Sequence, residues 1–279
     1  MDAFKGHKTV FSFRIDLDYF IPEQVMKVLE VTEKNGERMT WLINGKSSQH
    51  YPELVKRIAE TQDVQNHGHE HFASEDEKAN YDNIMKTDKF LRSVGIKPVA
   101  FSSPFGKWSE GLCMAVEKAG YPYSSEFRRF GKAFPFNPLI NGKNSKALQV
   151  PVHPVCEADL FYRGYSVKDA KEYFTKIIRL SCNNRIPIFL YGHPNYALGK
   201  YPEILQHILH EISSLEDVWH TTLTDYAGFW IKNKPKTGEE KDLNNAFLTK
   251  KINPLSYLRN YKNHLLMKAR MKKTGITNV

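Results

Sequence analysis

Short apolar runs alternate with helix-like stretches along most of this 279-residue chain, and this alternation constrains its fold more than any other feature. The runs have strand length, and the stretches between them repeat apolar residues at helical spacing. The expected strands are Thr9–Ile15, Met39–Ile43, Val64–Asn66, Pro98–Ser102, Ala147–Val152, Ile186–Tyr191 and Val218–Thr222. The expected helices are Pro22–Asn35, Pro52–Thr61, Ser74–Val94, Gly111–Gly120, Ser166–Asn183 and Tyr201–Leu215. Such an α/β pattern, repeated seven times over about 230 residues, favours one barrel of parallel strands over two small domains.

Composition excludes several other classes of protein. Hydrophobic residues make up 41% of the chain, which is ordinary for a globular protein. No apolar stretch approaches the roughly 20 residues of a membrane-spanning helix, and the first residues lack a signal-peptide pattern. The three cysteines, Cys113, Cys156 and Cys182, are too far apart for a disulfide framework or a Cys-x-x-Cys metal knuckle. We therefore expect a cytoplasmic protein.

The net charge of +9 lies at the C-terminal end of the chain. Residues 232–279 hold 12 Lys and Arg against 3 Asp and Glu, which leaves 28 of each sign in residues 1–231. We expect a barrel domain over 1–231, followed by a basic linker and a helical tail with an amphipathic helix at 255–273. Such a tail suits peripheral contact with an anionic membrane or an acidic partner, or it is simply solvated. No nucleic-acid-binding module is evident.

Carboxylates and imidazoles follow the apolar runs at the points where the strands are expected to end. Asp16 and Asp18 end the first run, and strand alternation points both to the same side. The segment 67–71, His-Gly-His-Glu-His, follows the third run, and His193 follows the sixth. In a parallel barrel these ends meet at one face, where functional groups gather. One Asp and two His would suit a divalent metal with open coordination positions.

The residues alone leave alternatives open. His67 and His71 share one face if the segment is helical, whereas His67 and His69 would pair in an extended His-x-His arrangement. Each motif also has a structural interpretation. Asp18 could cap the helix that starts near Pro22, the histidines could form an exposed loop, and His193 could be a buried structural residue.

In this order the segments resemble the polysaccharide deacetylase family, also described as carbohydrate esterase family 4 with the NodB-homology fold. The matching pieces are the acidic motif at 16–18, the histidine motif at 67–71, the Ser-Ser-Pro-Phe-Gly segment at 102–106 and the strand ending at His193. A fourth family motif is only echoed at 123–127. The resemblance covers roughly residues 9–231 and implies a distorted (β/α)7 barrel.

The resemblance also implies an activity, namely metal-dependent removal of an N-acetyl group from an amino sugar or glycan in polysaccharide or glycolipid synthesis. The metal ligands would be Asp18, His67 and His71, and the expected ion is zinc. Asp16 would be the general base and His193 the general acid. The expected substrate-binding residues are Ser103, Pro104, Phe105, Gly106 and Trp108, and a backbone N–H near Phe105 would stabilise the oxyanion. Tyr123 and Phe127 are further candidates for lining the sugar site.

One departure from the family pattern bears on activity. The third motif usually begins with an arginine that orients the base aspartate, and here that position is Ser102. This absence and the weak fourth motif together motivate an alternative, a weakly active or inactive barrel that binds a carbohydrate or a protein partner. Some branches of the family also hydrolyse amides that are not sugars.

Overall fold

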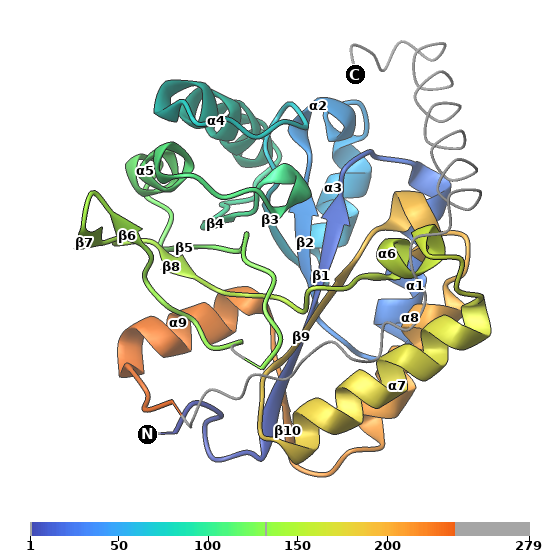
Figure 1. Cartoon of the computed structure of the whole chain (residues 1–279). Helices are drawn as coiled ribbons and strands as arrows, with labels where there is room; N and C mark the ends of the chain where they lie inside the picture. The colour runs from blue at the N-terminus through green and yellow to red at the C-terminus, as the bar shows by residue number, and fades with distance from the viewer. Residues whose placement is uncertain (1, 132, 238–279) are drawn as a thin grey trace.

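The computed structural model describes residues 2–131 and 133–237, and its central element is β1 (Thr9–Leu17). All nine residues of β1 are buried. It pairs in parallel with β2 (Thr40–Ile43), β9 (Ile188–Gly192) and β10 (Val218–His220). Figure 1 shows β1 running through the middle of the molecule between these strands. Because β1 has neighbours on both edges and cover on both faces, its polar residues are buried along with its apolar ones.

The sheet continues from β2 through four further strands, every one parallel to its neighbour. These are β3 (Asp63–Asn66), β4 (Ala100–Phe101), β5 (Tyr123–Ser124) and β8 (Leu148–Gln149). Among the described residues β8 and β9 share no ladder, but the backbone N–H of His153 donates to the carbonyl of Phe189 over 2.7 Å. The seven strands β1–β5, β8 and β9 thus curl into a distorted (β/α)7 barrel, and β10 pairs beside the start of β1.

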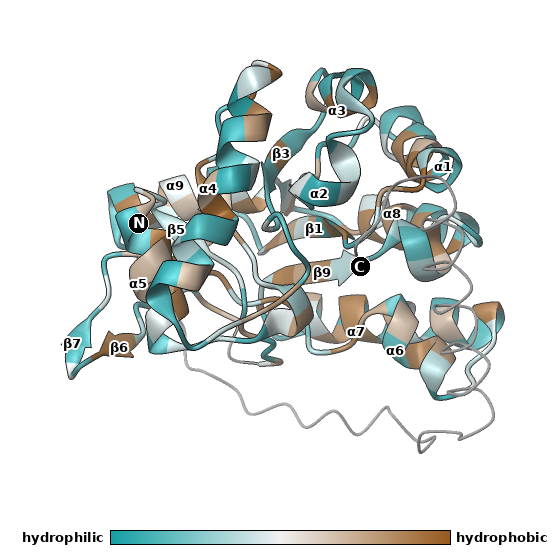
Figure 2. Cartoon of the chain, turned by 90° about the horizontal axis from the view of Figure 1, so that it is seen from above, coloured by the Kyte–Doolittle hydropathy of each residue, from teal (hydrophilic) through white to brown (hydrophobic). Residues whose placement is uncertain are grey.

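Helices surround the strands, as the view from above shows (Figure 2). The longer ones are α1 (Pro22–Lys34), α3 (Pro52–Ala59), α4 (Glu77–Ser93), α5 (Glu110–Lys118), α7 (Val167–Asn183), α8 (Glu203–Ser213) and α9 (Leu223–Asn233). Shorter elements are α2 (Gly45–Ser48), α6 (Glu157–Tyr162), η1 (Pro104–Gly106), η2 (Pro194–Leu198) and the hairpin β6 (Leu139–Ile140) and β7 (Lys143–Asn144). No described helix is both long and apolar enough to cross a membrane.

The main hydrophobic core lies between β1 and the helices. Phe13, Ile15 and Leu17 on β1 share one buried cluster with Val28 of α1 and Ile177 of α7. Alternation then turns the residues between them, including the charged ones, toward the barrel interior. The outer face of β1 therefore anchors the fold, and its inner face is left for polar groups.

The fold confirms the expected barrel and differs in local detail. β5 was not expected, because its two residues are too short to stand out as an apolar run. Asp18 does not cap α1, which begins after Ile21 without any side-chain cap, so the capping interpretation is wrong. α9 reaches Asn233, past the expected boundary at 231, and Lys236 bridges to Asp2. The expected tail helix at 255–273 lies outside the described residues.

Closure of the barrel at His153 has a consequence for acid stability. Burial lowers the pKa of this imidazole to about 3, and its Nε2 lies 2.8 Å from the Tyr173 hydroxyl. The unfolded chain, with an ordinary histidine pKa near 6.5, binds a proton that the folded chain rejects. Stability should therefore fall as the pH drops from about 6.5 toward 3, by up to about 1.4 kcal/mol per unit from this residue.

We predict that His153→Gln flattens this dependence. The free energy of unfolding, measured by denaturant titration across this pH range, should fall less steeply for the variant than for the wild type. Equal slopes for the two proteins would contradict the assignment.

Candidate metal centre and active site

The expected metal ligands come together at the carboxyl ends of β1 and β3. Nε2 of His67 and Nε2 of His71 each lie 3.1 Å from the same Asp18 oxygen, Oδ1. Gly68 makes this possible, because its φ of +78° bends the chain directly after β3, where an added Cβ would lie 2.7 Å from the Asn83 amide. The three side chains are shielded from solvent and could together hold a metal ion.

The protonation of the histidines favours a cation at this point. Nδ1 of His67 lies 2.8 Å from the Ser102 carbonyl, which can only accept, so this nitrogen carries the proton. In the neutral ring Nε2 then turns a lone pair toward the Asp18 carboxylate. Nε2 of His71 is buried and, despite its distance to Asp18, makes no hydrogen bond with suitable geometry among the described residues. The Nε2 lone pair of His67, an unbonded nitrogen of His71 and a carboxylate converging on one point fit a divalent cation.

The electrostatic environment of Asp18 also favours a bound cation. Burial alone raises the pKa of this carboxyl, but the adjacent His71 and His67 imidazoles outweigh that effect and hold the pKa well below its usual range. Asp18 is therefore an anion at neutral pH, as a metal ligand must be.

His69 points away from this group. Its Nδ1 lies beside α2, 3.1 Å from the position that a Cβ on Gly45 would occupy. Of the two pairings that the sequence left open, the structure brings His71 and not His69 beside Asp18 and His67.

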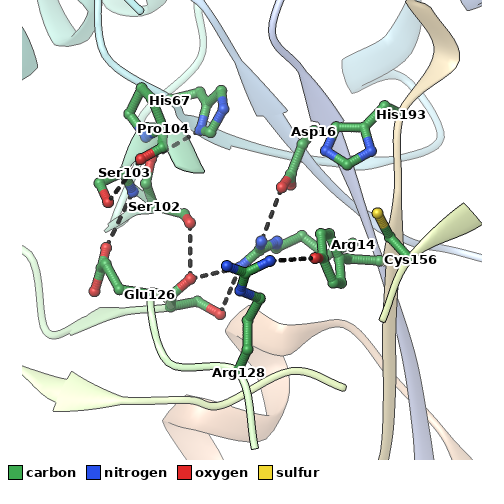
Figure 3. Close-up of polar contacts among 12 residues, drawn as sticks. Arg14, Asp16, His67, Ser102, Ser103, Pro104, Glu126, Arg128, Cys156 and His193 are labelled. Atoms are coloured by element: carbon green, nitrogen blue, oxygen red, sulfur yellow. Dashed lines mark hydrogen bonds and ion pairs between the residues drawn. The ribbon is translucent and has the colours of Figure 1, made fainter. Parts of the chain in front are cut away.

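Asp16 has an arginine partner that the family pattern did not predict. Nη2 of Arg14 donates to Asp16 Oδ2 over 2.8 Å, and both side chains are buried on β1 (Figure 3). Nη1 of Arg14 donates to the carbonyl and the hydroxyl of Ser125, which fixes the guanidinium. The positive charge that the family pattern places at position 102 is thus supplied here by Arg14, two residues before Asp16.

The other carboxylate oxygen of Asp16 is not held by the protein. Oδ1 is buried and accepts no hydrogen bond from the described residues. One oxygen of Asp16 is therefore fixed by an ion pair and the other remains available to accept a proton.

His193 lies at the end of β9 with Glu157 of α6 behind it. Glu157 Oε1 accepts the backbone N–H of His193 over 2.8 Å and lies 3.3 Å from its Nδ1. Burial disfavours the charged imidazole, but the Glu157 carboxylate and the Cys156 sulfur together outweigh burial and raise the pKa of His193 well above its usual value. The imidazole is therefore protonated at neutral pH and can donate a proton.

The loop after β4 brings one aromatic ring next to the histidines. Phe105 is 63% exposed, and its ring centroid lies 4.7 Å from that of His71. Its φ of 62° is a left-handed conformation that costs a residue with a Cβ about 1–2 kcal/mol. Ser103 and Pro104 are buried, and the Ser103 N–H donates to the buried Glu126 carboxylate. Gly106 follows in the same turn.

The remaining candidates for lining the substrate site are Trp108, Phe127 and Tyr123. Trp108 is partly buried, and its ring packs against Phe127, 5.7 Å away. Tyr123 does not line the site. It is buried and its hydroxyl lies 2.7 Å from Thr224 Oγ1, which donates to Asp63 at the start of β3, the opposite end of the barrel.

Sequence reasoning missed Arg14 and Glu157. Arg14 shares the inward face of β1 with Asp16, so strand alternation could have revealed it. Glu157 starts a six-residue helix that has no counterpart in the expected elements, and it is 36 positions before His193. No sequence signal connects those two residues.

Comparisons with known proteins agree with this architecture. The model of the polysaccharide deacetylase family matches residues 6–124. A putative polysaccharide deacetylase from Mycobacterium smegmatis is 18% identical with a TM-score of 0.71, over 86% of this chain and 96% of that one. A probable polysaccharide deacetylase from Pseudomonas aeruginosa PAO1 is 14% identical with a TM-score of 0.70, over 82% and 93%. The PuuE allantoinase is 17% identical with a TM-score of 0.69, over 84% and 94%.

A search of curated protein sequences gave no match. The curled parallel barrel is the fold of the solved polysaccharide deacetylases, and it is shared over most of the described chain. Over residues 6–124 the sequence is also similar to the polysaccharide deacetylase family.

We predict that His71→Ala weakens zinc binding at least about 100-fold, because it removes a ligand rather than a residue behind one. The measurement is calorimetric titration of zinc into the metal-stripped protein. His69→Ala is the matched control and should bind as tightly as the wild type. A larger loss for His69→Ala than for His71→Ala would reverse the assignment.

We also predict that Arg14→Met costs about 3–5 kcal/mol of stability, because it leaves the Asp16 carboxylate buried without a cation. The double variant Arg14→Met with Asp16→Asn should recover part of that loss. Arg38→Met, which breaks an exposed pair with Asp225, is the control and should cost less than about 1 kcal/mol. Additive effects of the two substitutions at positions 14 and 16 in denaturant unfolding would show that the buried pair is not coupled.

Proposed function

We propose that this protein is a metal-dependent hydrolase that removes the N-acetyl group from an amino sugar. The observation that carries the proposal is the convergence of Asp18, His67 and His71, with Asp16 and His193 at neighbouring strand ends. Figure 3 shows Asp16 and His193 beside each other, with His67 on the opposite side of Asp16 in this view. One acid, one base and a set of metal ligands are the parts that amide hydrolysis requires.

Zinc is the proposed ion, because two imidazoles and one carboxylate form a ligand set that leaves a coordination position open. A divalent cation held there acts as a Lewis acid toward the acetamide carbonyl and makes water more acidic. His67 is kept in the tautomer that leaves Nε2 free by its hydrogen bond to the Ser102 carbonyl.

Asp16 is the proposed general base. Its free Oδ1 accepts a proton from water, while Arg14 holds the other oxygen and keeps the carboxylate in place. The absence of an arginine at position 102 was one of two reasons to consider an inactive barrel, the other being the weak fourth motif. The ion pair with Arg14 supports an active base, because it gives Asp16 a cation without an arginine at position 102.

His193 is the proposed general acid. An amide nitrogen leaves as an amine only if it receives a proton, and the Glu157 carboxylate keeps the imidazole charged and oriented for that transfer. The Phe105 backbone amide is the proposed oxyanion donor, and the exposed Phe105 ring offers an apolar surface for a sugar face.

A second candidate activity is hydrolysis of an amide in a molecule that is not a sugar. It is favoured by the structural similarity to an allantoinase, which covers 84% of this chain. The same base, acid and metal ligands would serve, so the two candidates differ in substrate. An intracellular role in glycan synthesis and membrane contact through the basic tail stay predictions from the sequence.

The test is acetate release from a panel of N-acetylated amino sugars by the zinc-loaded protein, with allantoin hydrolysis measured in parallel. We predict that Asp16→Asn lowers kcat by about 10²–10⁴-fold, the usual contribution of a general base, while zinc binds as tightly as in the wild type. Asp217→Asn, a change of an exposed carboxylate beside His7, is the control and should keep full activity.

Two outcomes would decide against the proposal. Hydrolysis of allantoin but of no acetylated sugar would favour the second candidate. Stoichiometric zinc with no turnover of either class of substrate would favour a barrel that binds without catalysis.

A further inference from the structure

A second group of metal-binding side chains lies beside the proposed acid. Cys156, Glu157 and His193 each offer one ligand atom, a sulfur, an oxygen and a nitrogen, and these atoms all lie within 4.8 Å of one another. Their residues are 3%, 1% and 9% exposed. The group is separate from the Asp18 ligands and shares none of its residues with them. Figure 3 shows Cys156 next to His193, on the side away from His67.

The backbone builds this group rigidly. Cys156 precedes the first turn of α6, and its N–H and thiol both contact Asp159 Oδ2, at 3.1 and 3.4 Å. Glu157 is tied to the end of β9 by the His193 N–H. Gly192 allows that approach, because an added Cβ there would lie 2.6 Å from Glu157 Oε2. The three ligand atoms are therefore held in place by a helix start and a strand end.

An independent observation concerns the second oxygen of Glu157. Oε2 is buried and has no hydrogen-bond partner among the described residues. A buried carboxylate oxygen without a donor is costly, and such groups in proteins usually have a hydrogen bond or a bound ion. The mechanism proposed above uses Oε1 and leaves both Oε2 and the Cys156 thiol without a role.

We propose that Cys156, Glu157 and His193 form a second cation site, selective for a thiophilic divalent metal such as zinc or cadmium. One sulfur, one nitrogen and one oxygen ligand are a set that zinc accepts and that magnesium or calcium does not prefer. Binding releases the thiol proton of Cys156 and the proton carried by His193 to solvent, since both residues ligate in their deprotonated forms.

Occupation of this site would have an effect on catalysis, and that effect rests on the proposed function. A metal on His193 and Glu157 takes the proton donor out of use. An excess of zinc should therefore inhibit the enzyme that the first equivalent activates. The binding itself does not depend on that activity.

The test is cadmium titration of the metal-stripped full-length protein, followed by the ultraviolet absorption of a cadmium–thiolate bond. We expect two equivalents to bind, with the thiolate band rising with one of them. The chain has only three cysteines, so the band can be assigned. Cys156→Ser should lose the band and one equivalent, whereas Cys113→Ser, which changes a buried thiol within α5, should keep both.

Two further variants separate the sites. His71→Ala should keep the band and lose the other equivalent. Cys156→Ala is used if Cys156→Ser fails to fold, and circular dichroism measures whether each of these two variants is folded. A wild-type titration without a thiolate band, or a band that persists without Cys156, would overturn the second site.

The inhibitory effect of zinc is tested separately, by measuring activity. Excess zinc should lower acetate release at least 10-fold in the wild type and not in Cys156→Ser. Loss of the thiolate band in Cys156→Ser without any turnover in the wild type would leave the metal site standing and refute the proposed function. Equal inhibition of both proteins would refute the inhibitory effect.

Discussion

A charge that is removed from water must find a partner, and β1 carries two such charges on its inward face, with a third just beyond its end. Arg14 and Asp16 alternate along a strand whose other face is committed to the hydrophobic core, and Asp18 follows the last residue of that strand. Arg14 and Asp16 neutralise each other, and Asp18 turns to the imidazoles beyond β3. The central strand of the fold therefore also positions the candidate site, because its buried charges draw partners from the neighbouring strand ends.

Ser102 links these two pairings. Its carbonyl accepts a hydrogen bond from Nδ1 of His67. Its hydroxyl donates a hydrogen bond to the Ser125 carbonyl, which also accepts one from Arg14. Ser102 and Arg14 therefore share one acceptor, the Ser125 carbonyl, and this connects the loop after β4 to the ion pair on β1.

The sequence was sufficient to predict the barrel and the order of its motifs, because β1 and β9 are mostly apolar runs with polar residues at or just beyond their ends. It could not choose between His69 and His71, since that choice depends on how the chain bends at Gly68. It also could not pair Glu157 with His193, because their contact arises where a short helix meets a distant strand. Strand alternation could have placed Arg14 beside Asp16. A position-by-position comparison with the family motif, however, considers a cation at position 102 only.

The origin of this arginine also affects how the molecule can move. In the family pattern the supporting cation belongs to the loop after the fourth strand, so any displacement of that loop moves the support away from the base. Here the base and its cation are two residues apart on one strand that is paired on both edges. A change in the loop that carries Phe105 would therefore leave the ion pair between Arg14 and Asp16 intact, because neither partner belongs to that loop.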